Sequence, residues 1–268
     1  MITLHNYYRS LANTGIKVSP IGLGTVKIGR DKAVKYPTHF QIPNDNEIKT
    51  LLVMAQELGI NTLDTAPAYG NSEERLGKLL TNRQDWVIVS KAGEEFKDGK
   101  STYNFSSKHI VVSVERSLKR LNTDYLDVLL IHSNGDDLAI IKDDELWTTL
   151  AKLKQKGLIR SFGLSSKTIE GGMAALQKSD CAMVTYNITA QAEKPVLDFA
   201  MQHNKGIFIK KALASGHLCV ESNKTPLEAN FELIFSHPSI TSVIIGTINS
   251  EHIKQNVAMA VKCLHQCS

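Results

Sequence analysis

Short apolar runs alternate with longer amphipathic segments along almost the whole chain. A short apolar run is typical of a buried strand, whereas apolar residues three and four positions apart are typical of a helix. The predicted strands are residues 20–25, 60–64, 86–91, 127–132, 160–166, 182–187, 206–210 and 242–246. The predicted helices are residues 46–58, 72–80, 106–121, 143–155, 168–178, 194–203, 226–235 and 250–265.

This regular alternation predicts a fold of the α/β class. Strands joined by helices run parallel, because parallel neighbours need a long crossover connection. Eight such units predict a closed (β/α)8 TIM barrel, which we expect to form one domain over residues 1–268. Alternation around Asn13-Thr14-Gly15 predicts a β-hairpin before the first strand, and we expect this hairpin to cap the barrel floor.

An open sheet that binds a dinucleotide is the alternative fold. That fold normally carries G-x-G-x-x-G after its first strand. Here the sequence is "GLGTVKIG", which lacks the spacing, and a long polar stretch at residues 30–46 follows instead of a helix. The barrel is therefore the favoured prediction.

Composition and charge argue against several classes of protein. The net charge is +4, but the basic residues are interleaved with acids, so we expect no nucleic-acid partner. The four cysteines contain no CxxC pair, which favours reduced thiols over a zinc site or disulfides. No signal peptide or membrane span is evident. We expect a cytoplasmic protein, monomeric by default.

Polar side chains stand at the ends of three successive predicted strands. The second strand ends in Asp64 with Tyr69 in the turn after it, the third ends in Lys91, and the fourth ends in His132. Each residue taken alone is more often structural than catalytic. Active sites of (β/α)8 barrels lie at the carboxyl ends of the strands, so we expect these four to meet there.

The four side chains together predict proton donation to an oxygen that becomes negative. The ammonium of Lys91 is expected to lower the pKa of Tyr69 from its ordinary value of about 10. A buried ammonium needs an anion, which Asp64 can supply, and His132 can hydrogen-bond the same substrate oxygen. With no metal, serine–base pair or second carboxylate in the set, transfer of a hydride to a carbonyl fits best, and this implies a nicotinamide cofactor.

The stretches that contain these residues resemble the aldo-keto reductase family over essentially the whole chain. They are "YRSLANTGIKVSPIGLGT", "GINTLDTAPAYGNSEERLGKLL", "VIVSKAG", "SLKRLNTDYLDVLLIH", "LKQKGLIRSFGLSS" and "SVIIGTINSEHIKQN", in the family's order. The resemblance implies a barrel that interconverts small-molecule carbonyls and alcohols. It also implies a catalytic tetrad of Asp64, Tyr69, Lys91 and His132, with Tyr69 as general acid in reduction.

The resemblance implies cofactor contacts as well. Ser165 and Ser166 stand where the family has a Ser-Asn pair for the nicotinamide carboxamide, Met183 replaces a glutamine, and Lys210 replaces an aromatic residue. The other implied contacts are Gly24, Thr25, Asp64, Lys211, Leu213, Ser215, Gly246, Thr247, Gln255 and Asn256.

The adenosine end of the implied site bears on the choice of cofactor. The resemblance puts Gly246 and Thr247 at a helix N-terminus, which suits an anion. Strict NADPH members often have a lysine and an arginine where this chain has Gly246 and His252, and a neutral histidine attracts a phosphate less strongly. NADP(H) is favoured, with NAD(H) as the alternative.

Two other functions remain as alternatives. The first is a cofactor-binding redox sensor or regulatory barrel with little turnover. The second, a metal-dependent barrel hydrolase, is weaker because His132 stands nearly alone as a metal ligand. The loops at residues 26–45 and 94–105 and the C-terminal tail are expected to set substrate specificity.

Overall fold

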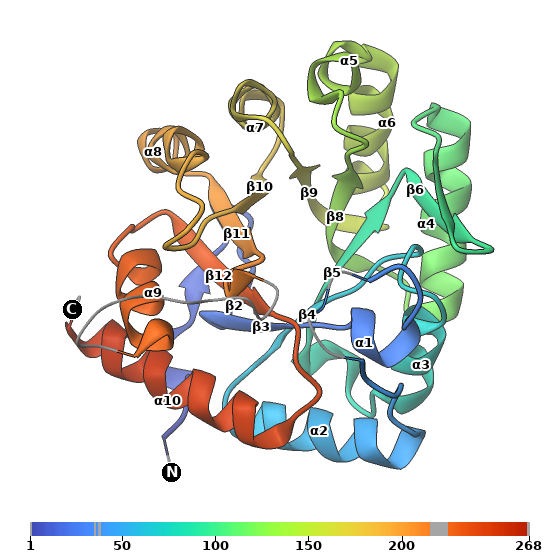
Figure 1. Ribbon diagram of the computed structural model, residues 1–268. Helices are drawn as coiled ribbons and strands as arrows, with labels where there is room; N and C mark the ends of the chain where they lie inside the picture. The colour runs from blue at the N-terminus through green and yellow to red at the C-terminus, as the bar shows by residue number, and fades with distance from the viewer. Residues whose placement is uncertain (1, 35, 37–38, 215–224, 267–268) are drawn as a thin grey trace.

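The computed structural model describes residues 2–34, 36, 39–214 and 225–266. Eight parallel strands close into a barrel surrounded by helices (Figure 1). Each strand pairs with the next one along the chain, and the last pairs with the first. The strands are β3 (Ile21–Gly24), β4 (Thr62–Asp64), β5 (Val87–Ala92), β8 (Leu126–His132), β9 (Ile159–Ser165), β10 (Cys181–Thr185), β11 (Gly206–Lys210) and β12 (Ile240–Ile245). The (β/α)8 prediction is confirmed.

Helices follow the barrel strands and shield them from solvent. All eight predicted helices are present, with ends shifted by one residue at most. They are α2 (Asp45–Glu57), α3 (Ser72–Leu79), α4 (Ser107–Leu121), α6 (Asp144–Gln155), α7 (Ile169–Lys178), α8 (Lys194–Gln202), α9 (Pro226–Phe235) and α10 (Ser250–Gln266). The amphipathic pattern was a sufficient guide because one face of each helix packs on the barrel.

The predicted hairpin closes the barrel floor. Its strands β1 (Arg9–Ser10) and β2 (Lys17–Val18) pair antiparallel. Leu11, Ile16 and Val18 of this segment belong to one buried apolar cluster with side chains of the barrel strands. The barrel members of the cluster are Val87, Val89, Val128, Leu130, Cys181, Met183, Phe208 and Ile244. The floor is thus filled with side chains, which leaves the opposite end for a site.

The structure corrects two expectations about the loops. One turn of helix, α1 (Val26–Gly29), follows β3 before the polar stretch begins. The segment predicted as a loop at residues 94–105 contains a second hairpin, β6 (Glu94–Lys97) and β7 (Lys100–Tyr103). Asp98 and Gly99 turn this hairpin with positive φ angles of 52° and 80°. Asp-Gly is a strong hairpin signal, so the sequence did contain the information.

The structure also adds a short helix, α5 (Asp137–Lys142), and the 3-10 turns η1 (His5–Tyr7) and η2 (Arg83–Asp85). Across the described part of the chain, none of the helices has the length and hydropathy needed to cross a membrane.

Candidate active site

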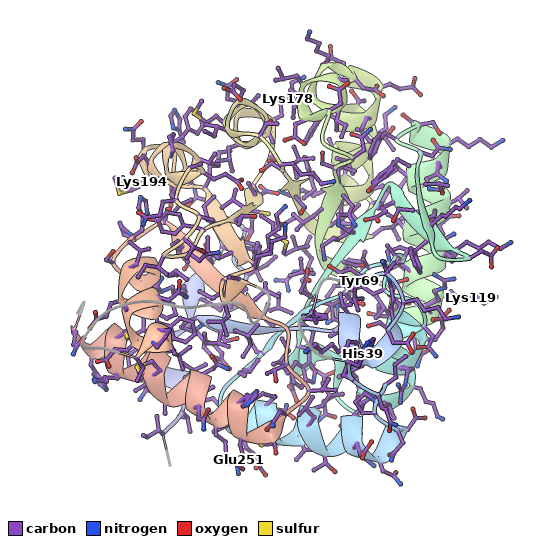
Figure 2. The ribbon with its side chains drawn as sticks, in the orientation of Figure 1. His39, Tyr69, Lys119, Lys178, Lys194 and Glu251 are labelled. Carbon is purple, nitrogen blue, oxygen red and sulfur yellow. The ribbon has the colours of Figure 1, made fainter. Side chains whose placement is uncertain are left out.

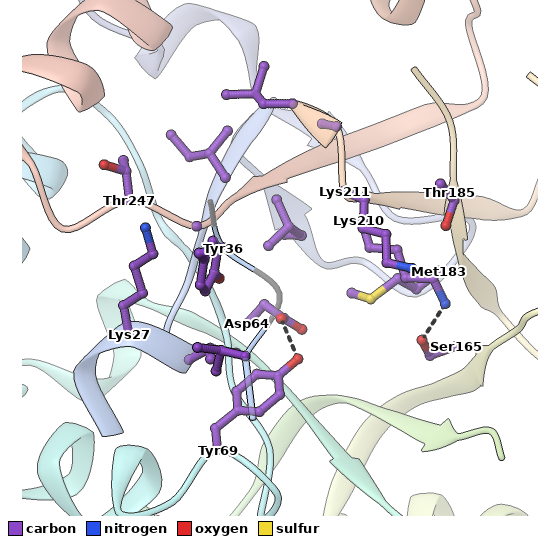
Figure 3. Close-up of a pocket in the computed structure, with 18 of the residues that line it drawn as sticks. Lys27, Tyr36, Asp64, Tyr69, Ser165, Met183, Thr185, Lys210, Lys211 and Thr247 are labelled. Carbon is purple, nitrogen blue, oxygen red and sulfur yellow. Dashed lines mark hydrogen bonds between the residues drawn. The ribbon is translucent and has the colours of Figure 1, made fainter. Parts of the chain in front are cut away.

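A cavity of about 990 Å³ opens at the carboxyl ends of the barrel strands. Each of the eight strands contributes at least one residue to the lining of this cavity. These residues are Gly24, Asp64, Lys91, His132, Ser165, Thr185, Lys210 and Ile245. In Figure 3, Asp64 and Tyr69 lie between Ser165 and Lys210 on one side and Lys27 and Thr247 on the other. The four predicted catalytic residues all line this cavity.

A buried carboxylate joins the first three of these residues. The Nζ of Lys91 contacts Oδ1 of Asp64 and donates a hydrogen bond of 3.0 Å to the carbonyl of Thr65. The hydroxyl of Tyr69 donates to Oδ2 of the same Asp64 at 3.4 Å (Figure 3). Lys91 is only 2% exposed, so its charge depends on this carboxylate.

The turn after β4 sets the position of Tyr69. The amide of Tyr69 donates to the carbonyl of Ala66 at 2.9 Å, which closes a tight turn. Gly70 then has a φ of 65°, and a Cβ atom there would lie 2.0 Å from the carbonyl oxygen of Gly29. Only glycine fits this position.

Figure 2 shows Tyr69 among the inner side chains, whereas Lys119 and Lys178 lie on outer helices.

Burial raises the pKa of Tyr69 well above its ordinary value of 10.0, and the negative charge of Asp64 adds to the effect. The expectation that Lys91 lowers this pKa is therefore wrong. The charge of Lys91 is compensated by Asp64, and the phenol faces the carboxylate. The hydroxyl consequently keeps its proton, as a proton donor must.

His132 lies beside Tyr69 and has a partner that sequence reasoning missed. The two rings are nearly perpendicular, with centroids 6.3 Å apart. The Nδ1 of His132 lies 2.8 Å from Oε2 of Glu94, in the hairpin that was predicted as a loop. Burial lowers the pKa of His132 below 6.5, while Glu94 raises it. For Glu94, burial alone would raise the pKa, but His132, Ser101 and Arg30 outweigh it and bring the pKa to about 2.

Lys210 lines the same cavity, beside Ser165 (Figure 3). Its Nζ donates to Oγ of Ser165 at 3.0 Å and to the carbonyl of Ser166 at 2.6 Å. Burial lowers the pKa of Lys210 to about 8. The Oγ of Ser166 is buried and has no partner among the described residues. Met183 lies in the same wall and is 2% exposed.

Glu193 also lines this part of the cavity and was missed. Glu193 lies in the loop between β10 and α8, away from the end of a strand, so the search for polar residues at strand ends did not find it. Its Oε1 accepts a hydrogen bond of 3.0 Å from the amide of Thr185. Its Oε2 is buried and, within the described part of the chain, has no hydrogen-bond partner.

The wall that faces α10 contains the residues implied for adenosine phosphate. Gly246, Thr247, His252, Gln255 and Asn256 all line the cavity. However, α10 begins at Ser250, so Gly246 and Thr247 lie in the loop before the helix and not at its N-terminus. Asn249 accepts hydrogen bonds from the first-turn amides of Glu251 and His252 at 2.9 and 3.3 Å. The helix end is therefore already capped.

The remaining implied cofactor residues have mixed positions. Lys211 and Leu213 line the cavity, and Ser215 lies outside the described residues. Thr25 is not part of the lining. Its hydroxyl donates to the carbonyl of Asp64 at 2.9 Å and accepts a hydrogen bond of 2.7 Å from Oγ of Ser72. Thr25 thus links the end of β4 to the first residue of α3 through hydrogen bonds.

Comparison with known proteins places this geometry in context. The model of the Aldo/keto reductase family matches residues 20–232. A crystal structure of a Pseudomonas aeruginosa protein assigned to the aldo-keto reductases superposes with a TM-score of 0.89 and 53% identity, over 98% of this chain and 97% of that one. The uncharacterized oxidoreductase YqkF of Bacillus subtilis is 27% identical over 94% of this chain and 90% of its own. The NADH-specific methylglyoxal reductase of Escherichia coli is 30% identical over 72% of this chain and 60% of its own.

Proposed function

Because the chain belongs to the aldo/keto reductase family, we propose that it reduces an aldehyde or a ketone with a nicotinamide cofactor and that Tyr69 donates the proton. The observation that carries the proposal is the buried contact of Lys91 and Tyr69 with Asp64 at the carboxyl ends of the strands. A protonated phenol and a compensated ammonium, both facing one cavity beside His132, suit an oxygen that gains negative charge.

Each residue has a separate part in the proposed proton transfer. The substrate oxygen replaces Asp64 as the hydrogen-bond acceptor of Tyr69, and the phenol then protonates it. The ammonium of Lys91, whose Nζ lies 4.6 Å from the centroid of the Tyr69 ring, stabilises the phenolate that remains. His132 borders the same space and orients the oxygen. General acid catalysis of this kind contributes about 10²–10⁴-fold to a rate.

The residues present fit a nicotinamide cofactor. Buried polar atoms normally have partners, yet Oγ of Ser166 and Oδ1 of Asn256 have none within the described residues, and both residues line the cavity. Gly246 leaves the wall open, since a Cβ atom there would lie 2.9 Å from the hydroxyl of Tyr36. When bound, the reduced nicotinamide supplies a hydride to the carbonyl carbon. The residues proposed to hold the cofactor are Gly24, Asp64, Ser165, Ser166, Lys211, Leu213, Gly246, Thr247, Gln255 and Asn256.

NADP(H) is the cofactor we favour. Lys27 and Thr247 both line the cavity (Figure 3), and no carboxylate among the described residues pairs with Lys27. Such an ammonium suits a phosphate. His252 in place of an arginine, and a relative that is NADH-specific, support NAD(H) as the alternative. Titrations with NADPH and NADH side by side decide between them.

A turnover assay tests the proposed activity. The wild-type protein is incubated with NADPH or NADH and a panel of aldehydes and ketones, and the loss of reduced-cofactor absorbance is followed. The proposal predicts turnover with at least one carbonyl compound. Cofactor binding without turnover on any of them would instead support the redox-sensor function, which the replacements at Met183 and Lys210 favour.

A further inference from the structure

We propose that Lys210 makes this protein bind the reduced cofactor more tightly than the oxidised one. The inference rests on the proposed function, since it concerns the nicotinamide ring. It goes beyond that function because it assigns to one side chain a discrimination between two redox states, and that discrimination is measurable without any substrate.

The first observation is that Lys210 is a cation with only neutral partners in direct contact. Its Nζ donates to the hydroxyl of Ser165 and the carbonyl of Ser166, at 3.0 and 2.6 Å. No carboxylate of the described residues forms an ion pair with it. Both hydrogen-bond partners are uncharged, and the carboxylates of Glu193 and Asp137 act on Lys210 without forming an ion pair with it. The positive charge of Lys210 therefore also acts on whatever occupies the cavity.

The second observation is that Lys210 lies at the catalytic end of the cavity. Its Nζ donates to Oγ of Ser165, and Ser165 is paired with His132 across strands β9 and β8. The charge of Lys210 accordingly lowers the pKa of His132. A nicotinamide ring that reduces a carbonyl held by Tyr69 and His132 must lie within reach of that carbonyl. The ring therefore lies in the electric field of Lys210.

The two redox states of the ring respond differently to that field. The oxidised ring carries a positive charge, whereas the reduced ring is neutral. Two like charges in a partly buried cavity repel each other by enough to change a binding constant roughly tenfold or more. The phosphates and the adenosine are the same in both forms, so their interactions cancel in the ratio of the two dissociation constants.

The discrimination should depend on pH, because burial lowers the pKa of Lys210 to about 8. As pH rises through that value the ammonium becomes neutral and the repulsion disappears. His132 titrates on the acid side of this range, because burial lowers its pKa below 6.5. The charged and titratable groups that act on Lys210 are Glu193, Lys211, Lys91, Asp137 and His132.

Titrations of the wild type and of variants test the inference. NADPH, NADP⁺, NADH and NAD⁺ are titrated into the wild type, Lys210→Met and Lys210→Gln by calorimetry, at about pH 7 and about pH 9.5, on either side of the pKa. The matched control is Lys205→Met, at the residue just before β11, where the Nζ donates to the carbonyl of Ser179 at 2.7 Å.

At the lower pH, the wild type and Lys205→Met should bind the reduced form with clear preference. Both Lys210 variants should reduce the oxidised-to-reduced ratio of dissociation constants about tenfold, mainly by tighter binding of the oxidised form. In the wild type the ratio should also fall at the higher pH, whereas in Lys210→Met it should stay constant.

An unchanged ratio in both Lys210 variants would overturn the inference, and so would an equal loss of affinity for both redox forms. If neither variant folds, the titrations of the wild type at the two pH values still test the inference. A ratio of dissociation constants that is the same at both pH values would contradict a titrating ammonium. Failure of the wild type to bind any of the four cofactors would overturn the proposed function, and this inference with it.

Discussion

The proposed active site is organised around one carboxylate, Asp64. Asp64 accepts from both Lys91 and Tyr69, and Asp64 and Lys91 are buried while Tyr69 is half-buried. A buried charge that loses its partner typically costs about 3–5 kcal/mol, so the ammonium and the carboxylate depend on each other. The phenol keeps its proton in this space, because burial and the carboxylate of Asp64 raise the pKa of Tyr69.

Glu94 should control the protonation of its neighbour His132. In Glu94→Gln the negative charge that raises the pKa of His132 is lost, so this pKa should fall further below 6.5. The pKa can be measured by NMR titration of the His132 ring protons. Glu95→Gln is the control, because Glu95 pairs with Arg116 and His109 instead. A His132 pKa that is unmoved or raised in Glu94→Gln would contradict the assignment.

At the residue scale, the sequence predicted the members of the site better than their electrostatics. The strand-end rule found Asp64, Lys91 and His132 because barrel geometry brings strand ends together. It missed Glu94 and Glu193, which enter the cavity from loops whose paths depend on tertiary packing. The raised pKa of Tyr69 was also missed, because pKa values depend on burial and on distances that a sequence does not contain.

Element positions were predicted closely, since the periods of strands and helices are local properties of the sequence. The exceptions are short elements, such as α1 and the β6–β7 hairpin, because they are too short to show a periodic pattern of apolar residues. The helix α10 begins at Ser250 as predicted, but Gly246 and Thr247, which were expected at its N-terminus, lie in the loop before it. Asn249 caps that helix three residues after Gly246, and this cap follows from hydrogen bonds and not from the apolar pattern.

The N-terminal cap of α2 should contribute measurably to stability. The Oδ1 of Asn44 accepts from the amide of Glu47 at 3.0 Å, and Oε2 of Glu47 accepts from the amide of Asn44 at 2.7 Å. Asn44→Ala removes one half of this capping box and should lower the free energy of unfolding by about 1 kcal/mol. Urea denaturation measures the change. Asn46→Ala, two residues on and equally exposed, should cause little loss, and equal losses in both variants would argue against the cap.

On the scale of the whole molecule, the cavity is a product of barrel closure. Six of the eight strands each deliver one polar side chain, and only the closed ring brings these side chains around a common space of about 990 Å³. The closed ring was predictable from the eight repeats. The shape of the cavity was not, because Tyr36, Lys27 and Arg30 reach it from the polar loop and helix after β3.

Cofactor binding should stabilise the entire barrel, because residues from all eight strands line the site. A ligand that binds only the folded state adds about 2.7 kcal/mol of stability at a free concentration of about 100 times its dissociation constant. Thermal unfolding should therefore shift upward with NADPH or NADH. Sodium phosphate at the same ionic strength is the control. No shift beyond that control with either cofactor would count against a cofactor site in this cavity.

The most direct test of the account concerns the hydroxyl of Tyr69. Steady-state kinetics and cofactor titrations are compared for the wild type, Tyr69→Phe and Tyr125→Phe, with a carbonyl substrate that the wild type reduces. Tyr125 lies just before β8, away from the cavity, and its ring packs against Arg83. We predict that Tyr69→Phe loses at least about a hundredfold in kcat while its affinity for the cofactor is preserved, and that Tyr125→Phe behaves as the wild type. Wild-type turnover by Tyr69→Phe would contradict the central claim that this phenol donates the proton.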